Sequence, residues 1–133
     1  MPTIMVIDDD RQFCKLMEKM LELDGFRVMT HHSIATARVH LEQELPDLLC
    51  CDMKISGDNG FDFLVHRQEI HGLLDVPIIA ITGDDRLSSQ VKAAELGIFA
   101  YLIKPFDRKD LISMIESALV AKNQKINSSG TGY

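Results

Sequence analysis

Short apolar runs alternate with segments of helical pattern five times along the chain. The runs cover residues 4–7, 26–30, 48–51, 76–81 and 98–103. The connections are short, and parallel neighbouring strands need crossovers of this kind, which are usually helices. The sequence therefore predicts a doubly wound α/β fold, with a five-stranded parallel sheet covered by helices on both faces.

The helical segments carry their own start and stop signals. In the first segment, apolar residues at helical spacing give an expected buried face of Phe13, Leu16, Met17, Met20 and Leu23. Gly25 is expected to end this helix, while Ser33 and Asp107 are expected to begin the second and the last. The third and fourth helices are expected over residues 61–70 and 87–96.

The length and composition fit one domain. At 133 residues, 46% of them hydrophobic, the chain can bury one core of ordinary size. After Lys122 the composition changes to Asn, Gln, Lys, Ser, Gly and Thr. We therefore predict a domain over residues 1–122 and a disordered tail or linker stub over residues 123–133.

The charged residues argue against two classes of partner. The formal net charge is -6, and the 14 basic residues are spread evenly along the chain, so we expect no basic face for nucleic acid or an anionic membrane. The chain shows no basic leader before a long apolar segment, and no apolar run near the roughly 20 residues of a spanning helix. We expect a cytoplasmic protein, with Cys14, Cys50 and Cys51 as buried reduced thiols.

Acidic residues follow two of the apolar runs. Asp8, Asp9 and Asp10 come after the first run, and Asp52 comes directly after the third. Because parallel strands end at one edge of such a sheet, these carboxylates are expected to lie close together. Two carboxylates 4 Å apart repel by roughly 1 to 4 kcal/mol, and a hard divalent cation such as Mg²⁺ relieves that repulsion. The alternative is a solvated acidic cluster at the start of the first helix, where negative charge is favoured.

Thr82 and Lys104 come at the ends of the fourth and fifth runs. Each has an ordinary explanation, as a β-branched strand residue and as a surface lysine. Beside the carboxylates, however, a hydroxyl and an ammonium complete a cage for a transferring phosphoryl group, whose charge is spread over its equatorial oxygens. The combination predicts a metal-assisted phosphoacceptor site centred on Asp52.

Five sequence motifs carry a resemblance to a known family. They are VIDDD at residues 6–10, PDLLCCD at 46–52, GDNG at 57–60, PIIAITG at 77–83 and YLIKPF at 101–106. In this order and spacing they make the chain resemble the receiver domain of bacterial-type two-component response regulators, over roughly residues 3–122. The resemblance implies a flavodoxin-like receiver fold and a phosphorelay signalling switch rather than a turnover enzyme.

The resemblance also implies a metal site and a phosphodonor. Asp52 would accept a phosphoryl group from the phosphohistidine of a histidine kinase or a histidine phosphotransfer protein. Asp9 and Asp52 would bind Mg²⁺ directly, Asp8 would act through water, and the backbone carbonyl of Lys54 would be a further ligand.

Further matching positions imply phosphoryl binding and switching. Thr82, Gly83 and Lys104 would bind the phosphoryl group. Thr82 and Tyr101 would be the switch pair, and the change would reach the fourth helix, fifth strand and fifth helix, which control a partner or a downstream domain. The peptide bond between Lys104 and Pro105 is expected to be cis, an isomer otherwise rare in proteins.

Several positions depart from the family pattern or lie beside it. Ser56 stands where the family usually has proline, which implies a looser loop. Lys54 and Asp84 each lie two residues beyond a site residue, and we predict that they tune the lifetime of the phosphorylated state. The segment 98–101 lacks the acidic residues of a common receiver dimer, so we expect a monomer or a weak dimer. Phe99 could belong to an apolar partner surface or to the core.

Two other functions compete with this prediction. A phosphatase of the haloacid dehalogenase type also forms an aspartyl phosphate, and Asp8 and Asp10 fit its Asp-x-Asp motif. That enzyme needs acidic metal ligands on a strand after the lysine, whereas only a final helix and a polar tail follow Lys104. A receiver-like interaction module without phosphorylation chemistry is the second alternative, and the complete set of site residues argues against it.

Overall fold

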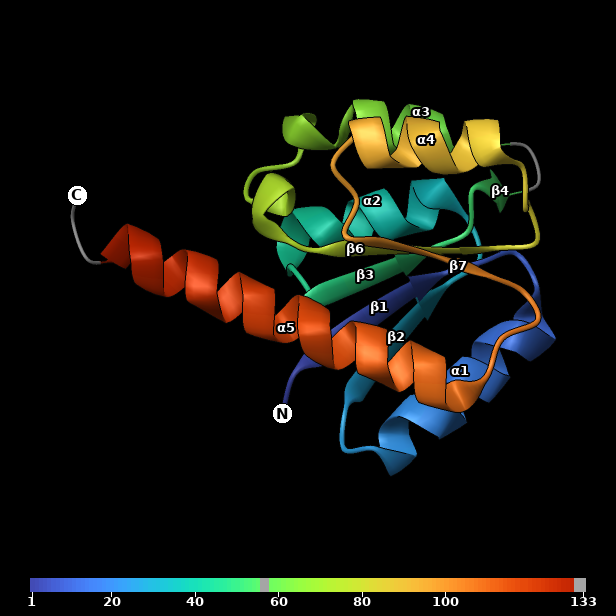
Figure 1. Ribbon diagram of the computed structural model, residues 1–133, viewed down its shortest axis with the longest axis horizontal. Helices are drawn as coiled ribbons and strands as arrows, with labels where there is room; N and C mark the ends of the chain where they lie inside the picture. Colours follow the sequence, from blue (N-terminus) through green and yellow to red (C-terminus); the bar gives the residue numbers. More distant parts are fainter. Residues whose placement is uncertain (56–57, 131–133) are drawn as a thin grey trace.

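A parallel sheet forms the centre of the molecule (Figure 1). The computed structural model describes residues 1–55 and 58–130. The strands are β1 (Thr3–Ile7), β2 (Arg27–His31), β3 (Leu48–Cys51), β6 (Ile78–Thr82) and β7 (Ala100–Ile103). They pair in the order β2-β1-β3-β6-β7, and every pairing is parallel. The predicted five-stranded parallel sheet is therefore confirmed.

Helices cover both faces of the sheet, as predicted (Figure 1). Helices α1 (Arg11–Leu23) and α5 (Arg108–Gly130) lie on one face. Helices α2 (Ile34–Gln43), α3 (Gly60–Val65) and α4 (Leu87–Glu95) lie on the other. Three of the four helical connections join neighbouring parallel strands, while α2 carries the chain from β2 past β1 to β3, and this reversal makes the fold doubly wound.

The sheet separates two apolar cores. Alternate residues of one strand enter different cores: Leu48 and Cys50 pack with α1 and α5, whereas Leu49 and Cys51 pack on the opposite face. All four side chains are at most 1% exposed. Burial on both faces explains why the apolar runs are continuous rather than alternating. The three cysteines are buried free thiols, as predicted.

Capping side chains mark the beginnings of α1 and α2, and a glycine follows the end of α1. The Asp10 carboxylate accepts hydrogen bonds from two backbone N–H groups of the first turn of α1, and the Ser33 hydroxyl caps α2 in the same way. Gly25 follows α1 with a φ of +88°, a conformation that favours glycine. The acidic residue Asp10 therefore serves the helix, while its neighbour Asp8 serves the site described below.

The buried face of α1 differs from the prediction. Cys14, Met17 and Leu21 face the core, whereas Leu16 and Leu23 are 58% and 83% exposed. Two apolar stripes run along this helix, and the stripe centred on Cys14 faces the sheet. Of the predicted residues, Met17 is buried, and Phe13 and Met20 are partly buried against the same core.

Three segments differ from the predicted elements. The loop after β3 contains a two-stranded antiparallel sheet of β4 (Lys54–Ile55) and β5 (Asp58–Asn59), where only a loop was expected. Helix α3 ends at Val65, and the short 3-10 helices η1 (Arg67–Glu69) and η2 (Leu73–Asp75) follow it. Helix α5 continues to Gly130, so most of the predicted disordered tail is helical. Ser56 lies outside the described residues.

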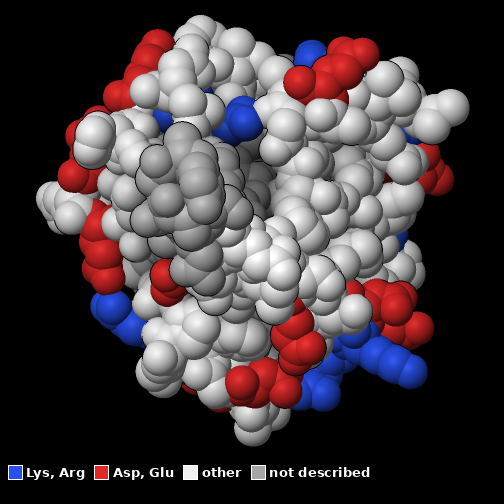
Figure 2. Space-filling model, turned by 60° about the vertical axis from the view of Figure 1, so that its left-hand side comes forward, with Lys and Arg blue, Asp and Glu red and all other residues white. Residues whose placement is uncertain are grey.

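The surface carries charges of both signs. Figure 2 shows one face of the molecule, on which Lys and Arg lie among Asp and Glu rather than in one basic patch. Within the described part of the chain, no helix is both long enough and apolar enough to cross a membrane.

Candidate functional site

Two buried carboxylates and one ammonium meet at the carboxyl edge of the sheet. Lys104 Nζ lies 2.7 Å from Asp8 Oδ2 and 3.3 Å from Asp52 Oδ2. Asp8 is 2% exposed and Asp52 is 8% exposed. The structure therefore brings together three of the predicted site residues, one from each of three strand ends.

The sheet register explains this meeting. Strands β1 and β3 are neighbours, and Ile7 pairs with Cys51, so the next residues along each strand, Asp8 and Asp52, leave the sheet side by side. The Asp52 N–H donates to Ile7 O at 3.0 Å, which continues the ladder up to Asp52. Chain order reverses at β1, where ligands bind in folds of this kind.

Burial and the neighbouring charges shift the pKa values of Asp8 and Lys104. Burial raises the pKa of Asp8, and the hydrogen bond from Lys104 lowers it by less. Burial alone would lower the pKa of Lys104, but the hydrogen bonds and charges of Asp8 and Asp52 raise it overall. The hydrogen bond from Lys104 therefore does not fully offset the burial of Asp8.

The oxygen donors fit a hard divalent cation. The Asp8 and Asp52 carboxylates converge on Lys104 Nζ, and carboxylate oxygens belong to the donor class that Mg²⁺ prefers. Asp9 is exposed beside them. The Lys54 N–H donates to Asp52 Oδ1 at 3.0 Å, which orients the Asp52 carboxylate and holds the Lys54 backbone at the site. The Lys54 side chain is exposed.

Gly60 packs directly against the backbone of Asp52. A Cβ atom at this position would lie 2.6 Å from Asp52 O and 2.8 Å from Met53 Cα, which no side chain tolerates without a shift. The Gly60 N–H also donates to Met53 O at 3.2 Å. The first residue of α3 therefore packs against the backbone of Asp52 and Met53 and helps to position it.

The predicted switch residues meet at the backbone of Asp84. Its N–H donates to Thr82 Oγ1 at 3.3 Å, and its carbonyl accepts a hydrogen bond of 2.6 Å from the Tyr101 hydroxyl. Thr82 is buried, and Gly83 is exposed with open space around it. Tyr101 thus contacts the loop after β6 rather than Thr82 itself.

Lys104 is positioned by both backbone and side-chain contacts. Its N–H donates to Thr82 O at 2.8 Å, and the following peptide bond, to Pro105, is cis, the isomer that the resemblance implied. Its Nζ also lies 4.0 Å from the centre of the Phe13 ring, at a distance suited to a cation–π contact.

Four residues at or near the site were not predicted. Phe13 contacts Lys104, and Cys14 Sγ donates to Asp8 O at 3.3 Å. Arg86 and Ser89 bind the Asp84 carboxylate. Only Phe13 had a sequence signal, because an aromatic residue in the first turn after an acidic strand end faces the same edge.

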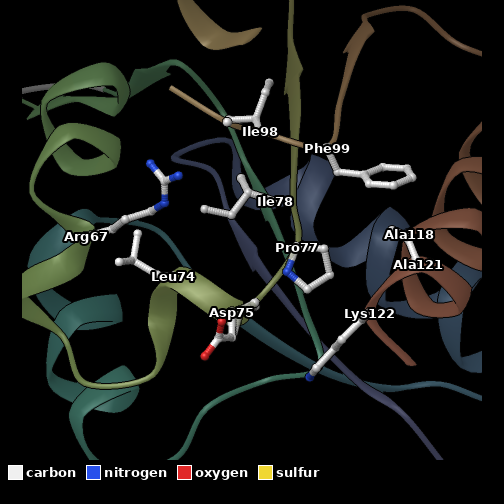
Figure 3. A pocket seen from close by; sticks show the side chains of 12 residues that line it. Arg67, Leu74, Asp75, Pro77, Ile78, Ile98, Phe99, Ala118, Ala121 and Lys122 are labelled. Atoms are coloured by element: carbon white, nitrogen blue, oxygen red, sulfur yellow. The ribbon is translucent and has the colours of Figure 1, made fainter. Parts of the chain in front are cut away.

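A separate pocket lies at the amino ends of β6 and β7 (Figure 3). Its volume is about 330 Å³, and Arg67, Pro77, Phe99 and Lys122 are among the residues that line it. Figure 3 shows the Phe99 ring turned toward α5. Phe99 is 41% exposed, so it lies outside the core. The pocket is at the opposite edge of the sheet from Asp52 and does not belong to the candidate site.

Comparisons with known proteins agree with this geometry. The chain is 36% identical over 117 residues to the DNA-binding transcriptional regulator NtrC of Azospirillum brasilense, covering 88% of this chain and 24% of that protein. It is 33% identical over 119 residues to the transcriptional regulatory protein CpxR of Escherichia coli K12, covering 90% of this chain and 50% of that protein. The chain thus spans half or less of these curated relatives.

Solved structures share the fold. A response regulator receiver domain protein from Clostridium thermocellum matches with a TM-score of 0.83 and 30% identity, covering 93% of this chain and 98% of that one. The solution structure of the beryllofluoride-activated NtrC4 receiver domain dimer matches with a TM-score of 0.84, covering 92% of this chain and 99% of that one, at 23% identity. The family model of the response regulator receiver domain matches residues 4–116. This chain belongs to the response regulator receiver domain family.

Proposed function

We propose that this chain is a phosphorelay switch in which Asp52 accepts a phosphoryl group from a phosphohistidine, in a reaction that depends on Mg²⁺. The observation that carries the proposal is the convergence of Asp8, Asp52 and Lys104 at the carboxyl edge of the sheet. The donor would be a histidine kinase or a histidine phosphotransfer protein.

The chemistry is a transfer between two residues. An Asp52 carboxylate oxygen attacks phosphorus, the N–P bond of the phosphohistidine breaks, and its electron pair stays on the departing imidazole. Asp8, Asp9, Asp52 and the Lys54 carbonyl would hold Mg²⁺, which supplies charge stabilisation for the phosphoryl oxygens. Lys104 would move from the two carboxylates to a phosphoryl oxygen, and its raised pKa keeps it cationic.

The product is a mixed anhydride that water can hydrolyse. The domain would thus promote its own dephosphorylation and would not turn over a separate substrate. We propose that Lys54 and Asp84 tune this lifetime. The exposed Lys54 side chain is free to screen the acceptor. The Asp84 side chain is engaged by Arg86, so any screening by it requires a loop movement. Unchanged dephosphorylation rates in Lys54→Ala and Asp84→Ala variants would contradict the tuning role.

The output would pass through Thr82 and Tyr101. The Thr82 hydroxyl would leave the Asp84 N–H and turn to a phosphoryl group, while the Tyr101 ring, whose hydroxyl binds Asp84 O, would take an inward position. Helix α4 and strand β7 adjoin this point, so their surface would change and act on a partner or on a further domain. Because the net charge is -6, we propose that this domain itself makes no direct contact with nucleic acid.

The test uses acetyl phosphate or beryllofluoride with Mg²⁺, followed by mass mapping of the modified aspartate. The expected label lies on Asp52 and disappears in Asp52→Asn. A label on Asp8 would instead indicate the dehalogenase-type phosphatase. A protein that takes up neither reagent would be a receiver-like interaction module without the chemistry.

A further inference from the structure

The pocket at the amino ends of β6 and β7 has the size of a small-molecule site. Its volume is about 330 Å³, and ligand pockets usually measure roughly 300 to 1,000 Å³. Segments far apart in the sequence form its walls: η1 with Arg67, the start of β6 with Ile78, the residue before β7, Phe99, and α5 with Ala121. We call this cavity the amino-edge pocket.

The inner surface of the amino-edge pocket is apolar. Ile78 is 2% exposed, and Figure 3 shows its side chain at the centre of the cavity. Two large apolar side chains at the rim remain in water, because Leu74 is 57% exposed and Phe99 is 41% exposed. An apolar group that covered these side chains would remove their surface from water, which is favourable. The pocket therefore suits a ligand with an apolar body.

Helix α5 leaves the space open because its side chains at this point are small. Ala118 and Ala121 lie one turn apart and both line the pocket. Figure 3 shows them beside the Phe99 ring. Ala118 is fully buried, whereas Ala121 is only partly buried. A larger side chain at position 121 would therefore enter the pocket rather than the core.

Arg67 supplies the pocket with a positive charge. Its Nη1 donates to Leu64 O at 2.7 Å and its Nη2 donates to Leu96 O at 2.5 Å. These carbonyls fix the guanidinium without cancelling its charge, and they occupy two of its five N–H donors. Burial lowers the pKa of Arg67, and among the described residues no carboxylate opposes this shift. An anion in the pocket would supply the missing negative charge.

The other charged residues of the pocket do not change this balance. Lys122 Nζ lies 3.5 Å from Asp47 Oδ1, so its charge has a carboxylate partner. Figure 3 shows the Asp75 carboxylate directed away from Ile78. A ligand that rests on Ile78 therefore meets the positive charge of Arg67.

We propose that the amino-edge pocket binds a small amphipathic carboxylate. The carboxylate of the ligand contacts the Arg67 guanidinium, a pair that forms charge-assisted hydrogen bonds. The apolar body of the ligand lies on Ile78 and Phe99 and reaches α5 at Ala121. Because this pocket and Asp52 lie at opposite edges of the sheet, the inference goes beyond the proposed function and does not depend on it.

Three probes of similar size and different charge test the proposal: phenylpropionate, its neutral amide phenylpropanamide, and the cation phenylpropylamine. Each is titrated into the ¹⁵N-labelled full chain, and NMR follows the backbone N–H resonances of Gly97, Phe99 and Ala121. Phenylpropionate should shift these resonances with a dissociation constant on the order of 1 mM. The neutral amide should bind about tenfold more weakly, because its hydrogen bonds to Arg67 are not charge-assisted.

Variants assign the preference to Arg67. Arg67→Gln should bind phenylpropionate and the neutral amide equally, and its retained binding of the amide shows that the pocket is intact. Arg27→Gln is the matched control, because Arg27 begins β2, at the far side of the same edge, and pairs with Glu44 at 2.9 Å. This control should keep the tenfold preference for the carboxylate.

A second variant tests the location. Ala121→Leu fills the pocket and should abolish the binding of both probes, while uptake of beryllofluoride at Asp52 stays as in wild type. Should Ala121→Leu fail to fold, Phe99→Ala removes a ring that is 41% exposed and should weaken both probes instead.

The proposal is overturned if phenylpropionate shifts none of these resonances, or if the amide or the amine binds as tightly as the carboxylate. It is also overturned if the preference survives in Arg67→Gln, or if a folded Ala121→Leu binds both probes as wild type does. A wild-type protein that takes up no beryllofluoride contradicts the proposed function at Asp52 and leaves these results unaffected.

Discussion

Two buried carboxylate centres differ in how their charge is balanced. At the ends of β1 and β3, Asp8 and Asp52 share a lysine that comes from 96 and 52 residues away in the sequence. In the loop after β6, Asp84 is bound by residues two and five positions further along the chain. The first centre raises the pKa of Asp8 and the second lowers that of Asp84. The first can still gain from a bound cation, whereas the second is complete and acts as a structural contact.

The largest expected effect comes from removing the shared lysine. Lys104→Met leaves two buried carboxylates without their cation, and we expect the free energy of unfolding at pH 7 to fall by about 3 kcal/mol, as measured by urea denaturation. Lys92→Met is the matched control, because Lys92 also lies over a phenylalanine ring but no ion pair is described for it. Equal losses in the two variants would show that the buried charges are not the cause.

Substitutions at Gly60 and Gly83 compare how tightly the two regions are packed. Gly60→Ala places a methyl group 2.6 Å from Asp52 O and should lower the free energy of unfolding by about 2 kcal/mol. At Gly83, in the loop after β6, a Cβ atom meets nothing within 4 Å, so Gly83→Ala should be close to neutral. Thermal denaturation of both variants tests the difference, and a strongly destabilised Gly83→Ala would contradict it.

Magnesium should stabilise the first centre only. At ten times its dissociation constant, Mg²⁺ should raise the free energy of unfolding of wild type by about 1.4 kcal/mol. Asp9→Asn should reduce this gain, and Asp10→Asn should keep it, because Asp10 caps α1 and asparagine caps equally well. Calorimetric scans with and without Mg²⁺ measure it. A gain that survives in Asp8→Asn and Asp9→Asn would place the ion elsewhere.

The smallest expected effect is on the pH dependence of stability, to which Asp8 and Asp84 should contribute with opposite sign. The pKa of Asp8 is raised in the folded protein, so its contribution favours folding at acid pH and is lost as the pH rises through that raised value. The pKa of Asp84 is lowered, so its contribution is present above the ordinary value of 3.8 and is lost as the pH falls.

Stability profiles of Asp8→Asn and Asp84→Asn between about pH 3 and 6 should therefore depart from wild type in opposite directions. Asp8→Asn should make stability rise more steeply with pH, and Asp84→Asn should make it rise less steeply. Parallel profiles would remove the electrostatic contrast between the two centres.

The same contrast explains what the sequence could predict. Asp8, Asp52, Thr82 and Lys104 were identifiable because each marks a strand end, and a parallel sheet gathers its strand ends at one edge. Arg86 and Ser89 gave no such signal, because an arginine before a helix and a serine in its first turn are ordinary surface residues. Asp84 was singled out from the sequence, but its contacts with Arg86 and Ser89 depend on how the loop folds.

Other errors have similar physical causes. Helix α1 has two apolar stripes, and only the packing against the sheet decides that Cys14 and Leu21 are buried while Leu16 and Leu23 are not. The β4–β5 pair is held by few residues, too few for strand periodicity. Polar composition after Lys122 suggested disorder, yet a helix already nucleated by packing extends at low cost.

The extension of α5 means that a small tilt of this helix moves its far end by a larger distance. The helix has 23 residues, so at 1.5 Å per residue its far end is about 33 Å from its first turn. Figure 1 shows its last turns projecting beyond the sheet. A tilt of about five degrees at the first turn, close to Lys104, displaces the far end by about 3 Å. A small rearrangement near Lys104 would thus be larger at the far end of the helix.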